Sequence, residues 1–372
     1  AGSAWAVVAV VALSVSMFFV ARAYRTADAE RKRAEMEAKR ADINLTRALQ
    51  SVNGMLTDVA SDEFAHIPGM EPARRALLQK AIHLLERLVA DQDELPIVQF
   101  DTAKAYSKIA EIHEALGDFR EAEVTGKRAI AILNQLIEGD PQRFDYRDTL
   151  TRAYEHVGLA LFQQLPLRID DAVAMCEQQL LETKRLVDDF PYDLRIRRRL
   201  AEVHTDLGNF NWEAGRRVEA ESHLWRGAKI WDAIILEHPH LRDAADHAHA
   251  RQWLGGMLMR TKRFEPAERE LVKANQIYEH LVATEPDNAE WRGRLAHNRS
   301  YLGDLYFRRG EFSRSAEYRR KATELREALY QEYPHVYEHQ RRLVVCYFDL
   351  MLSCAKEKKY DEARELIDKR HQ

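Results

Sequence analysis

The stretch LGDLYFRRGEFSRSAEYRRKATELREALYQEYP, from Leu302 to Pro334, contains most of one unit of a repeated pattern. Apolar residues recur every three or four positions on both sides of Gly310, as amphipathic helices require. Gly310 suits a tight turn between two helices, and Pro334 cannot continue the second one. The unit is therefore expected to be a helix, a short turn, a second helix and a stop.

The same pattern recurs at a period near 48 residues. Prolines that follow an acidic or ring-bearing residue lie 50, 48, 47 and 48 residues apart, at Pro141, Pro191, Pro239, Pro286 and Pro334. Small residues in the middle of each unit lie 50, 48, 47, 48 and 48 residues apart, at Ala122, Ala172, Ala220, Ala267, Ser315 and Ala363. One helical pair cannot bury its apolar face alone, so we expect about six pairs to stack as a right-handed, all-α solenoid over residues 67–372.

Composition agrees with an all-helical chain and narrows the range of functions. The 372 residues include only 15 Gly and 10 Pro, and we expect no strands. Lys and Arg number 56 against 60 Asp and Glu, giving a net charge of -4, so no basic excess exists to bind nucleic acid. Cys346 and Cys354 stand too far apart on one expected helix to bridge, and Cys176 is distant in sequence, so we expect no disulfide framework.

The first residues have the composition of a membrane segment. No charged residue occurs from Ala1 to Ala21, and the apolar run is about long enough for a bilayer core. We predict a single transmembrane helix over residues 1–22. The alternative is a cleaved secretory signal, because Ala21-Arg22-Ala23 resembles a cleavage site, although the run is long for a signal and no basic residues precede it. The Arg and Lys residues that follow it would hold the C-terminal side in the cytoplasm.

Residues 23–66 are expected to form a charged, helical juxtamembrane linker. Opposite charges stand four apart at Asp28/Lys32 and Glu35/Lys39, a spacing that supports an exposed helix. An apolar stripe with a spacing of three or four follows, from Ile43 to Val59. It covers about two and a half heptads, so we favour packing on a neighbouring helix over a dimeric coiled coil.

The unit around Gly310 resembles a tetratricopeptide repeat. Leu302-Gly303, Tyr306, Gly310, Phe312 and Ala322 follow the L-G-x-x-Y…G-x-F…A signature of that family, and Leu254-Gly255 and Leu207-Gly208 repeat its first element. The family period is about 34 residues, so this chain has about 14 more residues in each unit. We interpret the difference as longer helices.

The order of segments also resembles the C-terminal half of membrane-spanning serine/threonine protein kinases of planctomycete-like bacteria. The resemblance rests on the apolar helix, the charged segment Ala29–Ala41 and the stretch Ile67–Leu78. It implies an upstream kinase domain and repeats outside the cytoplasm, in a single-pass protein of the bacterial inner membrane. This orientation is opposite to the one that the charges favour, and we favour the orientation that the resemblance implies. The chain does not begin with Met, so we expect further sequence before Ala1.

The sequence contains no catalytic motif. We find no phosphate loop, Gly-rich kinase loop, H-R-D, D-F-G, H-E-x-x-H or nucleophile elbow. We therefore expect no enzyme in this chain, no cofactor and no metal. His335 and His339 could face one way, but no third ligand accompanies them. We interpret the basic run from Arg195 to Arg199 as a solvated helix face rather than a site for an acidic partner.

The tetratricopeptide resemblance implies that the first helix of each unit lines a concave groove for a protein or peptide. An apolar residue four positions after the glycine site would anchor the partner or, equally, pack between helices. These residues are Phe162, Trp212, Met259 and Phe307. The polar neighbours are Glu111, Arg152, Asn209, Gln252, Arg260, His297, Asp304 and Arg308. We therefore expect a membrane-anchored protein-interaction scaffold, with the signalling tail of a transmembrane kinase as the alternative.

Overall fold

The computed structural model describes residues 71–90, 96–164, 168–334 and 336–370, together with Glu30, Lys32, Arg33 and Met36. The predicted transmembrane helix (1–22) and almost all of the predicted linker (23–66) lie outside the described residues, as does His335. The chain divides into two compact units after Met55, and the helices α3–α15 belong to the second. Within the described ranges, no helix combines the length and the apolarity that a membrane span needs.

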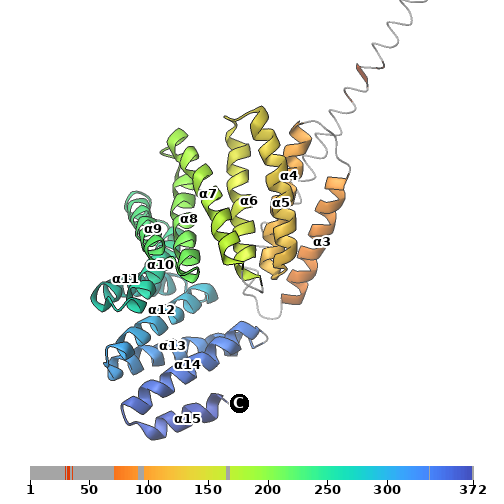
Figure 1. Cartoon of the computed structure of the whole chain (residues 1–372). Helices are drawn as coiled ribbons and strands as arrows, with labels where there is room; N and C mark the ends of the chain where they lie inside the picture. Colours follow the sequence, from red (N-terminus) through yellow and green to blue (C-terminus); the bar gives the residue numbers. More distant parts are fainter. Residues whose placement is uncertain are drawn as a thin grey trace, which may run out of the picture. The chain divides into compact units, whose positions relative to one another are not determined.

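The described part of the second unit consists of thirteen α-helices and contains no strand (Figure 1). From α4 onward the helices form six consecutive pairs, which confirms the predicted all-α helical repeat solenoid. The helices are α3 (Glu71–Ala90), α4 (Pro96–Leu116), α5 (Phe119–Gly139), α6 (Phe144–Gln163), α7 (Ile169–Asp189), α8 (Leu194–Glu213), α9 (Arg217–Glu237), α10 (Leu241–Arg260), α11 (Phe264–Thr284), α12 (Ala289–Arg308), α13 (Phe312–Glu332), α14 (Tyr337–Lys356) and α15 (Tyr360–Arg370).

The pairs stack on one another in chain order. Each helix packs mainly against the helix before it and the helix after it. First helices of successive pairs also approach each other, because α4 contacts α6, α8 contacts α10 and α10 contacts α12. Helices α4 to α13 have 20 or 21 residues each, so the long period does come from longer helices. This contact pattern places the first helices on the inner side of the stack.

Small residues let the two helices of a pair approach closely. The mid-unit residues of the first five pairs are fully buried, at Ala122, Ala172, Ala220, Ala267 and Ser315. Glycine provides the matching space on the first helix: a Cβ added at Gly208 would lie 2.5 Å from Leu224 Cγ, and one added at Gly255 would lie 2.6 Å from Leu271 Cγ. The two helices of a pair therefore pack closely, and this packing needs a small residue on both helices.

The turn within a pair contains a residue in the left-handed conformation. Gly117, Gly215 and Gly310 have φ of 78°, 78° and 80° at this place. Lys262 and Lys358 occupy the same place in two other pairs, with φ of 62° and 64°. A residue with a Cβ is strained there, whereas glycine is not.

Replacing Lys262 with glycine is expected to raise stability by about 0.5–1 kcal/mol, because relief of the left-handed strain exceeds the extra freedom of the unfolded chain. The midpoint of urea unfolding measures the change. Lys229→Gly is the matched control, because Lys229 is an exposed residue inside α9, where glycine should instead cost about 1 kcal/mol. A lower midpoint for Lys262→Gly than for the parent would contradict the strain at this turn.

Arginines that precede second helices connect successive pairs. In each case the guanidinium group contacts a carboxylate near the start of the second helix of the preceding pair. The pairs are Arg168–Glu123, Arg216–Asp170 and Arg263–Glu221, with N···O distances of 2.8, 2.7 and 2.6 Å. We call them the inter-pair bridges. In the first of them, although burial opposes the shift, hydrogen bonds from Lys127, Gln164 and Arg168 lower the pKa of Glu123 to about 2.

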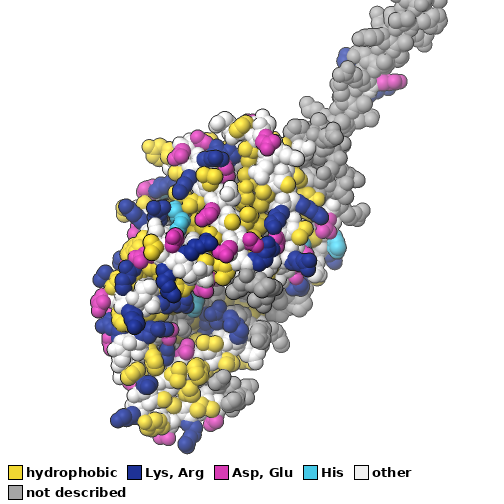
Figure 2. All heavy atoms as spheres, viewed as in Figure 1, with side chains coloured by type: hydrophobic (Ala, Val, Ile, Leu, Met, Phe, Trp, Pro, Cys, Tyr) yellow, Lys and Arg dark blue, Asp and Glu magenta, His cyan; other side chains and the backbone are white. Residues whose placement is uncertain are grey.

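The face of the molecule that is visible in Figure 2 mixes both signs of charge. Figure 2 shows Lys and Arg side chains interspersed with Asp and Glu side chains over the visible face, without a broad area of one sign. This agrees with the nearly equal numbers of basic and acidic residues in the chain.

The basic run from Arg195 to Arg199 is not a solvated face, contrary to the prediction. Only Arg195 is largely exposed, and Arg199 is 8% exposed. Carboxylates from other helices neutralise the remaining arginines: Arg197 pairs with Glu237, Arg198 with Asp243 and Arg199 with Asp148. The run therefore binds neighbouring helices of the same stack.

Candidate partner-binding cavity

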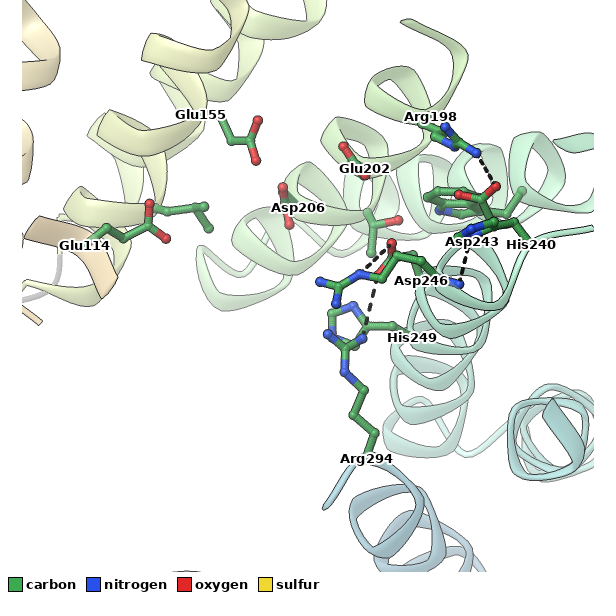
Figure 3. Close-up of a pocket in the computed structure, with 14 residues that line it drawn as sticks. Glu114, Glu155, Arg198, Glu202, Asp206, His240, Asp243, Asp246, His249 and Arg294 are labelled. Carbon is green, nitrogen blue, oxygen red and sulfur yellow. Dashed lines mark hydrogen bonds and ion pairs between the residues drawn. The ribbon is translucent and has the colours of Figure 1, made fainter. Parts of the chain in front are cut away.

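The inner side of the stack contains a cavity of about 710 Å³ (Figure 3). Its walls come mostly from the first helices α4, α6, α8, α10 and α12, and α9 contributes Trp231. Six lining residues are acidic and five are basic or histidine. They are Glu114, Glu155, Glu202, Asp206, Asp243 and Asp246, and Arg198, His240, Arg242, His249 and Arg294.

Helical spacing explains why these side chains meet. Arg198, Glu202 and Asp206 stand four residues apart on α8, so they lie on one face of that helix. Arg242 and Asp246 repeat the spacing on α10. Since α8 and α10 are in contact, the two rows lie next to each other on the inner side.

The cations of the cavity are already engaged. Arg198 Nη2 lies 2.6 Å from Asp243 Oδ2, and Arg294 lies 3.6 Å from Asp246 and 2.6 Å from Glu290. Burial, followed by the charges of Arg294 and His297, lowers the pKa of His249 to about 3. This histidine is therefore neutral near pH 7 and adds no positive charge.

Three carboxylates on the side of the cavity away from these cations have no ion-pair partner in the described part of the chain. Glu155 on α6 and Glu202 and Asp206 on α8 make no hydrogen bond or ion pair with any described residue. Figure 3 shows the three side chains directed into the same open space between α6 and α8. All three are partly buried. We call Glu155, Glu202 and Asp206 the carboxylate triad.

Burial and repulsion from neighbouring carboxylates raise the pKa values of Glu202 and Asp206. Burial, together with the charges of Glu155 and Asp246, raises the pKa of Glu202 to about 8, against the opposing effect of Arg198 and Arg199. Burial and the neighbouring carboxylates, Glu155 and Glu202 foremost, raise the pKa of Asp206 well above its ordinary value. These two carboxyl groups therefore keep their protons to a higher pH than free ones, because the fold supplies too little countercharge to ionise them.

Glu202 is expected to lower stability as the pH rises. Its pKa is higher in the folded protein than in the unfolded chain, so its stabilising contribution is complete below about pH 4.5 and is lost as the pH rises through about 8. Glu202→Gln removes this dependence. The melting temperature should therefore fall less between about pH 5.5 and about pH 8.5 for Glu202→Gln than for the parent. Glu138→Gln, at an exposed carboxylate, should behave like the parent; equal falls for all three proteins would refute the expectation.

The predicted apolar anchors lie away from this cavity, near the turn ends of the first helices. Met259 is 2% exposed and belongs to the core. Phe162 stacks on Phe210 with ring centroids 4.4 Å apart, and Phe307 packs edge-on against a neighbouring ring, that of Phe312, at 5.3 Å. In this conformation Met259 packs between helices, which is the alternative role expected for these positions.

Trp212 is the predicted anchor with the most distinctive surroundings. It is partly buried, with the guanidinium of Arg217 4.6 Å and that of Arg260 5.8 Å from its ring. Asn209, Trp212 and Arg260 share a small cavity of about 10 Å³ with Trp253 and Tyr301. The structure thus brings three of the predicted partner-binding residues together.

The other predicted polar residues are mostly engaged within the stack. Arg152 lies 3.4 Å from Asp148, and Asp304 lies 2.6 Å from Arg319. Gln252 and His297 contact each other at 3.2 Å, Glu111 contacts Lys108 at 2.6 Å, and Arg308 is exposed. None of the eleven predicted partner-binding residues, nor Glu111, lines the 710 Å³ cavity.

The described residues hold no ready metal site and no disulfide. No group of three or more His, Cys, Asp or Glu side chains in these ranges is arranged to bind a metal ion. Cys176, Cys346 and Cys354 are buried free thiols.

Comparison with known proteins establishes the fold. No family model and no curated protein matches the chain. A STAND signal-transduction ATPase with a tetratricopeptide repeat sensor, from Pyrococcus horikoshii, superposes with a TM-score of 0.58 at 13% identity, over 88% of this chain and 43% of that one. The apo form of RapI gives 0.56 at 12% identity, over 88% and 75%, and BtubC from P. vanneervenii gives 0.52 at 15%, over 68% and 89%. The fold is a tetratricopeptide-like helical repeat solenoid.

Proposed function

We propose that this chain is a protein-interaction scaffold that binds a peptide or protein partner on the inner side of the solenoid. The observation that carries the proposal is the 710 Å³ cavity, which spans five successive first helices and contains three carboxylates without partners. Its volume falls in the range of about 300–1,000 Å³ that is typical of ligand sites. Partly buried charges without partners weaken a fold, so their presence is best explained by a ligand that uses them.

An unbiased peptide selection tests this proposal. A random peptide library displayed on phage is selected against the full chain in detergent, and hydrogen exchange then locates the bound peptide. We expect slower exchange in α6, α8 and α10. Protection confined to second helices, or no enriched peptide, would count against the inner side as the binding surface.

The predicted apolar anchors are tested with the same peptides. If Trp212 and Phe307 contact the partner, Trp212→Ala and Phe307→Ala weaken peptide binding and leave helicity and thermal stability unchanged. A large loss of helicity would instead assign both rings to the core.

The proposal includes attachment to a membrane through residues 1–22. Its support is the uncharged apolar run from Ala1 to Ala21. On the kinase resemblance, the protein would be a single-pass component of a bacterial inner membrane with its repeats outside the cytoplasm. Labelling of a cysteine introduced at exposed Tyr192 with a membrane-impermeant maleimide in intact cells tests the side, because labelling only after lysis would place the repeats inside.

A signalling role forms the alternative within this proposal. The chain would then be the regulatory tail of a transmembrane serine/threonine kinase, in which partner binding alters the pairing of attached kinase domains. The resemblance at Ile67–Leu78 motivates it, and one structural neighbour carries a tetratricopeptide repeat sensor. The codons upstream of Ala1 decide it, since the absence of kinase motifs there removes this alternative.

A further inference from the structure

Elsewhere in the stack, several carboxylates that face another helix pair with an arginine. Asp148 contacts Arg199, and Asp243, which is 3% exposed, contacts Arg198. The carboxylate triad departs from this pattern, although Arg198 and Arg199 stand on the same helix as Glu202 and Asp206. Those two arginines are directed to other carboxylates, so the fold leaves the charge of the triad unmatched.

A second, independent feature of the cavity is an N–H donor without an acceptor among the described residues, on a side chain that is almost fully buried. Trp231 on α9 lines the cavity and is 1% exposed. Its indole N–H makes no hydrogen bond with any residue in the described ranges. The indole nitrogen is not among the fully buried polar atoms that lack a partner, so an acceptor oxygen of a ligand in the cavity can reach it.

Building on the proposed function, we infer that the cavity binds a peptide segment of the partner that contains lysine or arginine. An ammonium or guanidinium group placed between α6 and α8 would supply the countercharge that the carboxylate triad lacks, through charge-assisted hydrogen bonds. A backbone carbonyl of the same segment would accept the indole N–H of Trp231. A peptide provides both groups at once, whereas an anionic lipid or nucleic acid would be repelled.

Direct binding to the full chain in detergent tests the inference. The probe is a fluorescein-labelled, end-blocked peptide of about nine residues with three lysines among glycine and alanine, and its counterpart has glutamate in place of each lysine. Fluorescence anisotropy should show binding of the lysine peptide only, and its affinity should fall as NaCl rises from about 50 mM to about 500 mM. Tighter binding of the glutamate peptide would overturn the inference.

The decisive variant is Glu202→Gln/Asp206→Asn, which removes the two α8 charges. We expect its affinity for the lysine peptide to fall at least about tenfold. Its melting temperature at pH 8 should equal or exceed that of the parent, because the unmatched charges are gone, so unfolding cannot explain the loss. The matched control is Glu138→Gln/Asp188→Asn, which makes the same charge change at two exposed positions and should bind normally. Equal losses in both double variants would overturn the inference, because binding would then follow net charge alone.

Three further outcomes test this inference, and the last of them separates it from the proposed function. The lysine peptide should bind more tightly near pH 8.5 than near pH 6, since Glu202 and Asp206 are more fully ionised at the higher pH. Spermine that binds more tightly than the peptide would overturn the assignment to a peptide. Selected phage peptides that protect α6, α8 and α10 but contain no lysine or arginine would leave the proposed function standing and would overturn the basic-peptide inference.

Discussion

Replacing Arg251 with methionine is expected to destabilise the protein by about 3–5 kcal/mol, because it leaves a buried carboxylate without its cation. Arg251 on α10 is 7% exposed, and Glu270 on α11, which contacts its Nη1, is 5% exposed. The same guanidinium group contacts Asp232 on α9 and donates from Nε to His247 Nε2 at 2.7 Å. It therefore joins two successive helical pairs.

The free energy of unfolding in urea measures this effect, and a second variant isolates its cause. Arg251→Met/Glu270→Gln removes both buried charges, so it should recover most of the stability that Arg251→Met loses. Asp232 is half exposed, and water can solvate it when the arginine is absent. A double variant as unstable as Arg251→Met would show that lost packing, rather than the unpaired charge of Glu270, dominates.

Replacing Gly208 with alanine is expected to cost about 1–3 kcal/mol by overpacking the contact between α8 and α9. The added Cβ would lie 2.5 Å from Leu224 Cγ and 3.2 Å from the backbone nitrogen of the same residue. Rotation of the leucine cannot relieve the backbone contact, and this leucine is 1% exposed. The two helices would therefore have to move apart.

Gly293→Ala is the matched control for this substitution. Gly293 lies inside α12, and its added Cβ would meet Arg326 Nη1 at 3.5 Å, an ordinary contact. Alanine favours the helix there, so we expect a gain of up to about 1 kcal/mol in urea unfolding. If Gly208→Ala raises the midpoint as Gly293→Ala does, the contact between α8 and α9 is not overpacked and the expectation is wrong.

The fold was predictable because its signals are local and repeated. Pro141 and its equivalents close each second helix one residue beyond its C-cap, and Gly310 adopts the positive φ that the turn requires. Apolar spacing of three and four residues then defines the inner faces of both helices. Lys262 and Lys358 show the limit of this approach, because nothing in a lysine identifies a left-handed turn residue. Alignment to Gly310 at the repeat period is the signal that identifies them.

The cavity was not predictable in the same way, because it depends on contacts between distant residues. The tetratricopeptide resemblance predicts apolar anchors near the ends of first helices, but of the residues at those positions Met259 belongs to the core. The four-residue spacing of Glu202 and Asp206 was visible, but its meaning depended on where Arg198 points. That arginine contacts Asp243 on another helix, a pairing that no local pattern indicates.

The inter-pair bridges carry a consequence for how the protein unfolds. Each bridge, such as Arg216–Asp170, lies at least partly in solvent and joins only adjacent hairpins. Dissolved salt weakens such contacts. Disorder that begins at the C-terminal hairpin can then advance hairpin by hairpin, without a single collective transition. Calorimetric and van't Hoff enthalpies should agree at low ionic strength and diverge as salt increases.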